Sequence, residues 1–419
     1  MITALTLAIS FMALLASAVP TRRYAFARLV LVIFALGAGN IHLAVVSLAV
    51  MLFVNNGYRP PVVHLRRTEL IIGLSVGAII LVTFLSPVSP RTLAKLLHLG
   101  LFVFILLQLL QELANAERIR AYLKAMVWAA TAVAILGLVL DQLGLVEHPH
   151  IFPGRGANEG SVYLSLFGLL PALTLMLWER KPAYLAPCGI MAFAQVVALS
   201  RSNTVLAGVM LAAAIFFYFD SRAIKAAMLG VAGLIIYKSL DLINLEVERQ
   251  VNYSARERIE LTLYGWELWL QRPYTGWGWG STSELVPKAI LVEQEYPHFH
   301  NTWVQLLAEV GYLGWLFIGM FLFFGLRCIW IALRWTHSAA VSFYVIMAVV
   351  GIGWLGFFEA LLFGADRFIM LIIVLPIMGH MTSISLAAKR ASWMPQPPLD
   401  ASAERRQPDG PVADRPLAP

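Results

Sequence analysis

The stretch YLKAMVWAATAVAILGLVLDQL, residues 122–143, has no charged residue between Lys124 and Asp141. About 20 apolar residues in a row are enough for one helix to cross a bilayer core of about 30 Å. A helix also pairs its own backbone groups, which lipid cannot do, and the strict alternation of a barrel strand is absent. The stretch therefore predicts a transmembrane helix.

Similar stretches recur along most of the chain and predict an all-α polytopic membrane protein with about twelve transmembrane helices. One segment is ambiguous, because Gly37, Gly39 and Asn40 interrupt it. It is either one tilted helix or two short helices, which would raise the count to thirteen. The apolar segments lie near 2–20, 26–54, 69–86, 96–113, 122–143, 160–178, 184–200, 203–219, 223–240, 303–327, 338–361 and 366–388.

The composition of the chain supports a membrane protein and argues against a soluble, nucleic-acid-binding or disulfide-rich protein. Of the 419 residues, 59% are hydrophobic and 13% are charged, whereas soluble proteins carry about 25% charged residues. The net charge of +7 fits basic cytoplasmic loops better than nucleic-acid binding. The two cysteines, Cys188 and Cys328, lie in or beside apolar segments and predict neither a disulfide framework nor a metal cluster. No basic region precedes residues 1–20, so we expect a retained first helix rather than a cleaved signal peptide.

Basic residues in alternate loops predict the orientation, because such loops face the cytoplasm. The chain then divides into membrane helices over 1–240, a large periplasmic loop over 241–302, membrane helices over 303–390 and a disordered cytoplasmic tail over 391–419. Arg22, Arg23 and Arg28 fit poorly with a cytoplasmic amino terminus, which keeps the thirteen-helix alternative open. The loops assigned to the cytoplasm contain Arg59, Arg66, Arg67, Arg118, Arg120, Lys124, Arg180, Lys181, Arg222, Lys225, Arg327, Arg334, Lys389 and Arg390.

Three separate segments on the predicted outer side carry arginines, namely Arg155, Arg201 and the pair Arg256 and Arg258. Arg201 lies between two apolar segments, where an arginine is costly unless it is paired, faces water or snorkels to the interface. A guanidinium group binds phosphate oxygens as a planar fork, which an ammonium cannot do. These arginines therefore predict a site for a phosphate-bearing substrate.

Histidine supplies the remaining candidate chemistry. His300 has the pKa range of a general base, although an isolated histidine is more often structural. His298 and His300 could also bind a metal together with Glu293 or Glu295, but we expect no metal and no cofactor. His42, His98 and His380 are scattered through the apolar segments and are interpreted as buried polar contacts.

Aromatic residues follow the arginines in the outer loop. The stretch from Tyr264 to Trp269 is amphipathic, and Gly276–Trp277–Gly278–Trp279–Gly280 comes after the turn at Pro273. Tyrosine and tryptophan favour the membrane surface, so we expect an interfacial helix here.

Residues 300–314, HNTWVQLLAEVGYLG, have a His-Asn pair followed by Glu-x-Gly-x-x-Gly. This run resembles the signature of the O-antigen ligase and polymerase superfamily. Arg258 with the segment from Pro273 to Gly280 is similar to the family's arginine and Pro-x-x-Gly-x-Gly segment. Ser200–Arg201 resembles its Ser-Arg pair, and Asn158 its helix-opening asparagine. The tryptophans among the glycines depart from the usual aliphatic residues.

The resemblance implies a glycosyltransferase of the GT-C type in the bacterial inner membrane, with its active site facing the periplasm. It would transfer a glycan from undecaprenyl diphosphate to an acceptor hydroxyl, with inversion and without a metal. Arg201 and Arg258 match the diphosphate-binding arginines, and His300 matches the general base. Arg256 is a second choice for the diphosphate, and Arg155, Asn158, Asn301 and His298 are further candidate substrate contacts.

The acceptor divides the remaining hypotheses. An O-antigen ligase uses the lipid A–core oligosaccharide, and we favour it because the outer loop is one compact insertion. An O-antigen polymerase and a protein O-oligosaccharyltransferase stay open as alternatives. A flippase or transporter of lipid-linked oligosaccharide is the non-enzyme alternative, but it would need charged residues inside the spans.

Overall fold

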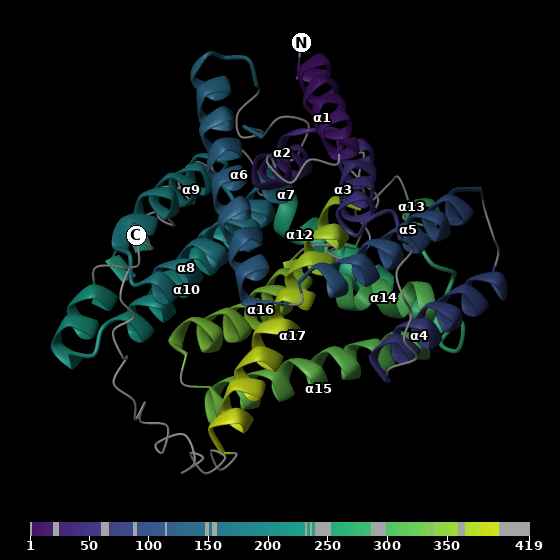
Figure 1. The fold of residues 1–419 in the computed structure, drawn as a ribbon. Coiled ribbons are helices and arrows are strands. Elements are labelled where there is room, and N and C mark those ends of the chain that lie inside the picture. The colour runs from purple at the N-terminus through teal and green to yellow at the C-terminus, as the bar shows by residue number, and fades with distance from the viewer. Residues whose placement is uncertain are drawn as a thin grey trace, which may run out of the picture.

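The computed structural model describes residues 2–19, 25–59, 67–86, 90–113, 115–146, 151–152, 157–230, 233–234, 237–238, 253–285, 299–336, 338–358 and 365–393. The regular elements in these ranges are helices, and no strand occurs among them. Figure 1 shows their arrangement. In chain order the helices are α1 (Ile2–Ala18), α2 (Ala25–Ala38), α3 (Ile41–Asn55), α4 (Arg67–Phe84), α5 (Pro90–Glu112), α6 (Ala116–Gln142), α7 (Ala157–Tyr163), the π-helix η2 (Leu164–Leu169), α8 (Leu170–Glu179), the 3₁₀-helix η3 (Pro182–Tyr184), α9 (Leu185–Val197), α10 (Arg201–Tyr218), α12 (Tyr253–Gln271), α13 (Thr282–Leu285), α14 (Thr302–Val310), α15 (Tyr312–Trp335), α16 (Ala339–Phe358) and α17 (Ala365–Trp393).

Seven helical stretches within the described residues are long and apolar enough to cross a membrane, and five further apolar helices are shorter. The described residues are therefore those of a helical, polytopic membrane protein, whereas the count of twelve spans stays a prediction. The stretch formed by α7, η2 and α8 is buried from residue 160 to residue 177, and α6, α9, α10 and α16 pack around it. This central stretch is one continuous helix that widens into a π-turn just before Pro171. Proline would clash with the preceding turn of a regular α-helix, which accounts for the wider turn.

The ambiguous second segment forms two helices, as the thirteen-helix alternative expected. Helices α2 and α3 pack against each other and against α1, and they meet at Gly39–Asn40. At this turn the backbone N–H of Asn40 donates to the Ser10 hydroxyl at 2.7 Å. At the other end of the pair, Arg28 donates hydrogen bonds to the Val19 carbonyl and the Asn55 side chain. The two helices therefore form a hairpin whose open end lies beside the end of α1.

The predicted span over 303–327 is wrong as a single helix. The short helix α14 ends at Val310, and α15 begins two residues later. Gly311 separates them with φ at +63°, a conformation that breaks the helical path and is easiest for glycine. Only α15 is among the helices long enough to cross a membrane.

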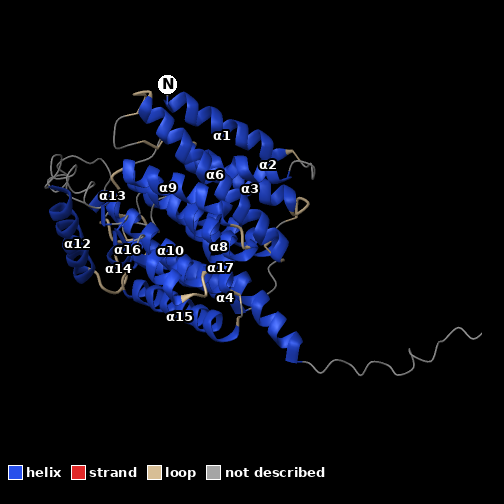
Figure 2. Cartoon of the chain, turned by 90° about the vertical axis from the view of Figure 1, so that its left-hand side faces the viewer, coloured by secondary structure: helices blue, strands red, loops and turns tan. Residues whose placement is uncertain are grey.

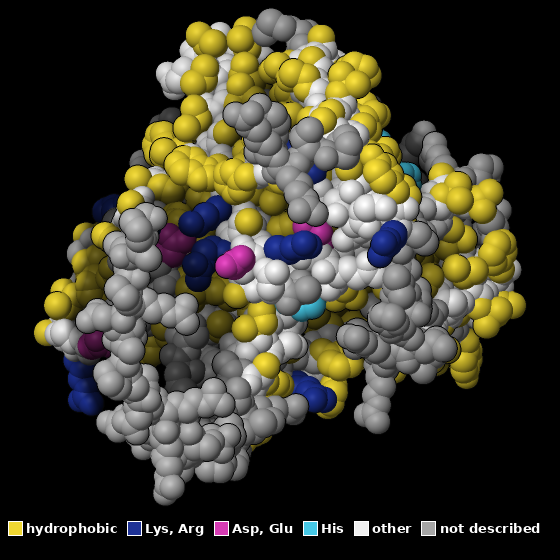
Figure 3. Space-filling view, in the orientation of Figure 1, with side chains coloured by type: hydrophobic (Ala, Val, Ile, Leu, Met, Phe, Trp, Pro, Cys, Tyr) yellow, Lys and Arg dark blue, Asp and Glu magenta, His cyan; other side chains and the backbone are white. Residues whose placement is uncertain are grey.

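Basic residues from several predicted cytoplasmic loops meet at one end of the bundle, named here the basic end. Arg118 contacts Glu112 at 2.9 Å, and Lys124 contacts Glu179 at 2.8 Å. Arg180 donates to the Tyr218 carbonyl at 3.1 Å, which adds the end of α10 to this group. Figure 3 shows Lys and Arg side chains, with acidic side chains among them, over the region where Figure 1 shows α6 and α8. These loops thus share one end of the bundle, and their assignment to the cytoplasm stays a prediction.

Helix α12 lies at the opposite end of the bundle, named here the α12 end. In Figure 2 it occupies the edge of the molecule farthest from the carboxyl end of α17, and its axis runs across the direction of α15. It packs against α14, with Leu261 and Leu268 buried beside Phe299 and Ala308. Gly265 permits this close approach, since a methyl group there would come within 3.0 Å of the Phe299 ring.

Candidate functional site

The first part of the site is the start of α10, where Arg201 follows a strained turn. Leu199 has a φ of +54°, which is costly for a residue with a branched side chain. Ser200 is buried, whereas Arg201 is exposed. In the described part of the chain the Arg201 guanidinium has no hydrogen-bond or ion-pair partner.

Buried amide and hydroxyl groups hold this turn in place. The Ser200 hydroxyl donates to Asn158 Oδ1 at 3.1 Å and accepts from Asn203 Nδ2 at 2.9 Å. The Ser165 hydroxyl donates to Asn203 Oδ1 at 3.3 Å, and Gln195 Nε2 donates to the Ser165 hydroxyl at 3.0 Å. These five residues are named here the polar network. It joins α7, η2, α9 and α10 directly behind Arg201.

The second part is His300, which also occupies a strained turn. Its φ is +48°. On one side Phe299 is fully buried against α12. On the other side Asn301 caps α14, because its Oδ1 accepts from the backbone N–H groups of Trp303 and Val304 at 3.1 Å each. These two fixed neighbours force the backbone of His300 into its bend and leave its side chain half-buried at the surface.

The third part is Arg258, half-buried on α12. One helical turn further along α12, the Thr262 hydroxyl donates to the Phe299 carbonyl at 3.4 Å. Arg258 therefore lies about one turn, roughly 5 Å along the axis, from the point where α12 contacts the residue before His300. No hydrogen-bond or ion-pair partner of Arg258 lies among the described residues.

Helix α16 connects the first part to the second. Trp354 Nε1 donates to the Ser202 carbonyl, next to Arg201, at 3.1 Å. Two residues later, Gly356 packs so closely on Trp303 that a methyl group at Gly356 would lie 2.7 Å from the indole ring. The residues next to Arg201 and the start of α14 after His300 thus both contact the carboxyl-terminal part of α16, and Thr262, one turn from Arg258, contacts Phe299.

The two glycine-containing motifs of the sequence contact each other directly. Trp277 N–H donates to the Ala308 carbonyl at 3.0 Å, Gly278 N–H to the Glu309 carbonyl at 2.8 Å, and Tyr312 N–H to the Pro273 carbonyl at 2.7 Å. Gly276 and Gly311 both have φ at +63°. A methyl group at Gly276 would come within 2.5 Å of the Glu309 backbone, and one at Gly311 within 2.6 Å of the Pro273 carbonyl. We name this contact the glycine lock.

Glu309 is the buried centre of the glycine lock. Its carboxyl group accepts from the backbone N–H groups of Gly280 and Thr282 at 2.5 Å and 3.3 Å, from the Thr282 hydroxyl, and from Gln305 Nε2 at 3.1 Å. Lys95 of α5 donates to the Gly280 carbonyl at 2.8 Å. Burial raises the pKa of Glu309, although Lys95 and the donors partly oppose this. The carboxyl group therefore ties the loop to α14, and Lys95 ties it to α5.

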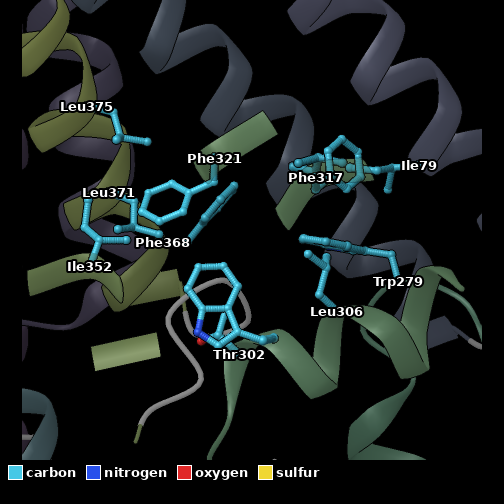
Figure 4. A pocket seen from close by; sticks show the side chains of 12 residues that line it. Ile79, Trp279, Thr302, Leu306, Phe317, Phe321, Ile352, Phe368, Leu371 and Leu375 are labelled. Atoms are coloured by element: carbon cyan, nitrogen blue, oxygen red, sulfur yellow. The ribbon is translucent and has the colours of Figure 1, made fainter. Parts of the chain in front are cut away.

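An apolar cavity of about 250 Å³ lies beside the start of α14. Thr302 and Trp303, which follow His300 and Asn301, form part of its wall. Figure 4 shows the rings of Trp279, Phe317, Phe321 and Phe368 around this space. The complete lining is Ile79, Leu99, Trp279, Thr302, Trp303, Leu306, Phe317, Phe321, Ile352, Phe368, Leu371 and Leu375.

The remaining predicted site residues divide into two groups. Asn158 and Asn301 are described, and both side chains make hydrogen bonds within the protein, one to Ser200 and one as the cap of α14. Arg155, His298 and the side chain of Arg256 lie outside the described residues. So do Glu293 and Glu295, on which the metal alternative depended.

Sequence reasoning missed the polar network, the glycine lock and the cavity. Gln195 and Asn203 had a usable signal, because polar amides within apolar segments point to internal partners. Glu309 stood in the quoted motif without a role. The interpretation of His42 and His98 as scattered buried contacts is wrong, because His42 is exposed, His98 is half-buried, and α3 and α5 bring their ring centroids to 5.2 Å.

Comparison with known proteins adds an independent finding. A family model described as O-antigen ligase matches residues 186–319, which include α9, α10, α12, α14 and the beginning of α15. A search of curated protein sequences found no match. The matched range contains Arg201, Arg258, His300 and the whole glycine lock. Over residues 186–319 the chain is therefore similar to the O-antigen ligase family, as its motifs predicted.

Proposed function

We propose that this protein is an O-antigen ligase of the bacterial inner membrane. It transfers a glycan from undecaprenyl diphosphate to a hydroxyl group of the lipid A–core oligosaccharide at the periplasmic face. One observation carries the proposal: the α12 end gathers two arginines without described partners and a strained histidine beside an apolar cavity.

Each part of the donor has a matching feature. The diphosphate is anionic, and Arg201 and Arg258 offer planar donor groups for its oxygens. The polyprenyl chain is apolar, and the cavity beside Thr302 and Trp303 offers an apolar surface for part of it. The donor is already activated by its diphosphate, so the protein has to position it and neutralise the charge that develops as it leaves.

The transfer then needs one proton acceptor. His300 takes the proton of the acceptor hydroxyl as that oxygen attacks the anomeric carbon. The bond from this carbon to the diphosphate oxygen breaks, and the diphosphate leaves with the electron pair toward Arg201 and Arg258. A single displacement of this kind inverts the anomeric configuration, and it needs no metal.

The test is complementation of a Gram-negative host that lacks its ligase but makes a compatible donor and acceptor core. The test compares wild type with His300→Ala, Arg201→Ala and Arg258→Ala. The control is Arg334→Ala, which changes an exposed arginine in the last turn of α15. Lipopolysaccharide is run on a gel, and the membrane level of each protein is measured. We expect a ladder with wild type and Arg334→Ala, and none with the other three.

Other outcomes contradict specific parts of the proposal. If wild type leaves the lipid A–core without glycan while the undecaprenyl-linked chains become longer, the protein is a polymerase. Glycan on a protein would identify an O-oligosaccharyltransferase. A ladder in every variant would show that His300, Arg201 and Arg258 are not needed for the transfer. Movement of lipid-linked glycan across the membrane by His300→Ala, with no transfer by wild type, would identify a transporter.

A further inference from the structure

Helix α12 carries an apolar stripe that no part of the described chain covers. Ile259, Leu263, Trp266 and Leu270 repeat at the spacing of one helical face, and their exposure ranges from 39% for Trp266 to 62% for Ile259. The stripe is distinct from the buried face, which holds Leu261 and Leu268.

The helix also has a polar face, where Glu260, Glu267 and Gln271 are exposed. At about 100° per residue these three positions lie on the side of the stripe away from Arg258. Three faces on one helix, one toward protein, one apolar and one acidic, fit a helix that lies at a boundary between protein, lipid and water.

The stripe adjoins the exposed side of α15 through Trp269. The Trp269 ring lies 4.7 Å from that of Trp266 in the stripe, 6.0 Å from that of Tyr312 and 6.3 Å from that of Trp315, the last two at the start of α15. Tyr312, Trp315 and Leu316 are themselves exposed, and α15 is the least buried of the seven long apolar stretches. Tryptophan and tyrosine concentrate where a spanning helix leaves the hydrocarbon. The exposed apolar surface of α12 thus adjoins the exposed apolar surface of a helix long enough to cross a membrane.

The direction of α12 agrees with this placement. Figure 2 shows it across the end of the bundle rather than along the helices that run through it. We propose that α12 lies in the plane of the membrane surface, with its apolar stripe in the boundary between headgroups and acyl chains and Glu260 and Glu267 toward water. The occupant of the stripe is the bilayer itself.

This placement deepens the proposed function, on which the following consequence rests. Arg258 is fixed on α12, so a helix lying at the membrane surface holds its guanidinium near the depth of lipid phosphate groups. A diphosphate attached to a polyprenyl chain arrives at that same depth. Helix α12 would then select a lipid-borne donor by position as well as by charge.

The test measures the surroundings of single nitroxide labels on the full-length protein in nanodiscs of phosphatidylcholine and phosphatidylglycerol. Labels are attached at Leu263→Cys on the stripe and Glu267→Cys on the polar face, in a background with Cys188→Ala and Cys328→Ser. Phe323→Cys, at an exposed position on α15, is the lipid reference. Collisions with oxygen and with a water-soluble nickel chelate are compared.

We expect the label at 263 to collide less often with the nickel chelate and more often with oxygen than the label at 267 does. The label at 263 should resemble the label at 323 in both respects. Equal nickel access at 263 and 267 would overturn the proposal. The proposal would also be overturned if the label at 263 were shielded from both reagents and lay close to the same label on another copy. The stripe would then be covered by a second copy of the protein. Because neither reading depends on transfer activity, failure here is distinguishable from failure of the proposed function.

Discussion

Leu199 and His300 are non-glycine residues with positive φ, and each stands beside a candidate functional residue or is one. Strain of this kind persists only where the surrounding structure enforces it, and it concentrates at functional sites. Around Leu199 the polar network supplies the constraint. Around His300 the buried Phe299 and the cap at Asn301 supply it.

Replacing His300 by glycine should separate its backbone role from its chemistry. Glycine adopts positive φ without cost, so His300→Gly should relieve about 1 kcal/mol of strain and keep the thermal unfolding temperature at or above that of wild type. His300→Ala keeps the strain and should not gain this stability. Both variants should lose transfer in a purified assay. Full activity in either variant would show that His300 is not the base.

The polar network should act on the donor through Arg201. Removing a buried hydrogen-bond partner costs about 1–3 kcal/mol, so Asn203→Leu should weaken the binding of a short polyprenyl diphosphate about tenfold or more. The same change should have no further effect in an Arg201→Ala background, because the interaction through Arg201 is already lost. Binding to the purified protein in detergent measures both effects.

Thr174→Val is the matched control for Asn203→Leu. It removes a buried hydroxyl that bonds only within its own helix, to the Leu170 carbonyl at 2.7 Å. It should leave diphosphate binding unchanged. Additive losses from Asn203→Leu and Arg201→Ala would instead assign the network a general role in stability.

The stabilising contribution of Glu309 should depend on pH. Burial raises its pKa in the folded protein above the usual 4.5, so the folded state binds the proton more tightly than the unfolded state. The contribution is then complete below about pH 4.5 and declines as the pH rises through the raised pKa. The Tm of wild type minus the Tm of Glu309→Gln should therefore fall from pH 5 to pH 8. A value that rises over this range would show that the folded state favours the carboxylate form.

At the scale of elements, the glycine lock joins a loop to the break between α14 and α15. Gly276→Ala and Gly311→Ala would each place a methyl group within 2.6 Å of backbone atoms that no rotamer change can move. Each variant should lose roughly 2 kcal/mol or more of stability and most transfer activity. Thermal unfolding in detergent and the gel assay measure the two effects.

Gly319→Ala, in the helix α15 that follows Gly311, is the control, because a methyl group at Gly319 meets no atom within 4 Å. It should keep both stability and activity. Loss of function at Gly319 as well would show that α15 is sensitive to any substitution, independently of the lock.

At the scale of the whole molecule, the cavity gathers residues from α4, α5, α14, α15, α16 and α17 into one space. If part of the polyprenyl chain lies there, Leu375→Trp should raise the KM for a lipid-linked donor severalfold and leave kcat nearly unchanged, since it removes binding rather than chemistry. Leu333→Trp is the matched control at an exposed position of α15. An unchanged KM in Leu375→Trp would place the chain elsewhere.

The helical class was predictable from residues 122–143 and the stretches like them, because length and apolarity alone decide it. The motif resemblance singled out Ser200–Arg201 and His300–Asn301, whose roles in catalysis and binding stay predictions. The break at Gly311 was not, because the surrounding residues are apolar enough to continue one helix. The contacts of Glu309 with Gly280 and of Asn203 with Ser165 were also out of reach, because they join segments that only the packed bundle brings together.

The glycine lock also determines which substitutions relatives of this protein could accumulate. Gly276 and Gly311 are constrained by backbone atoms on the opposite segment, which are the same whatever sugar is transferred. Lineages that switch to a new glycan should therefore keep both glycines and Glu309 unchanged while surfaces nearer the acceptor diverge. The residues of the glycine lock would then indicate common ancestry, and the variable residues would indicate which glycan is transferred.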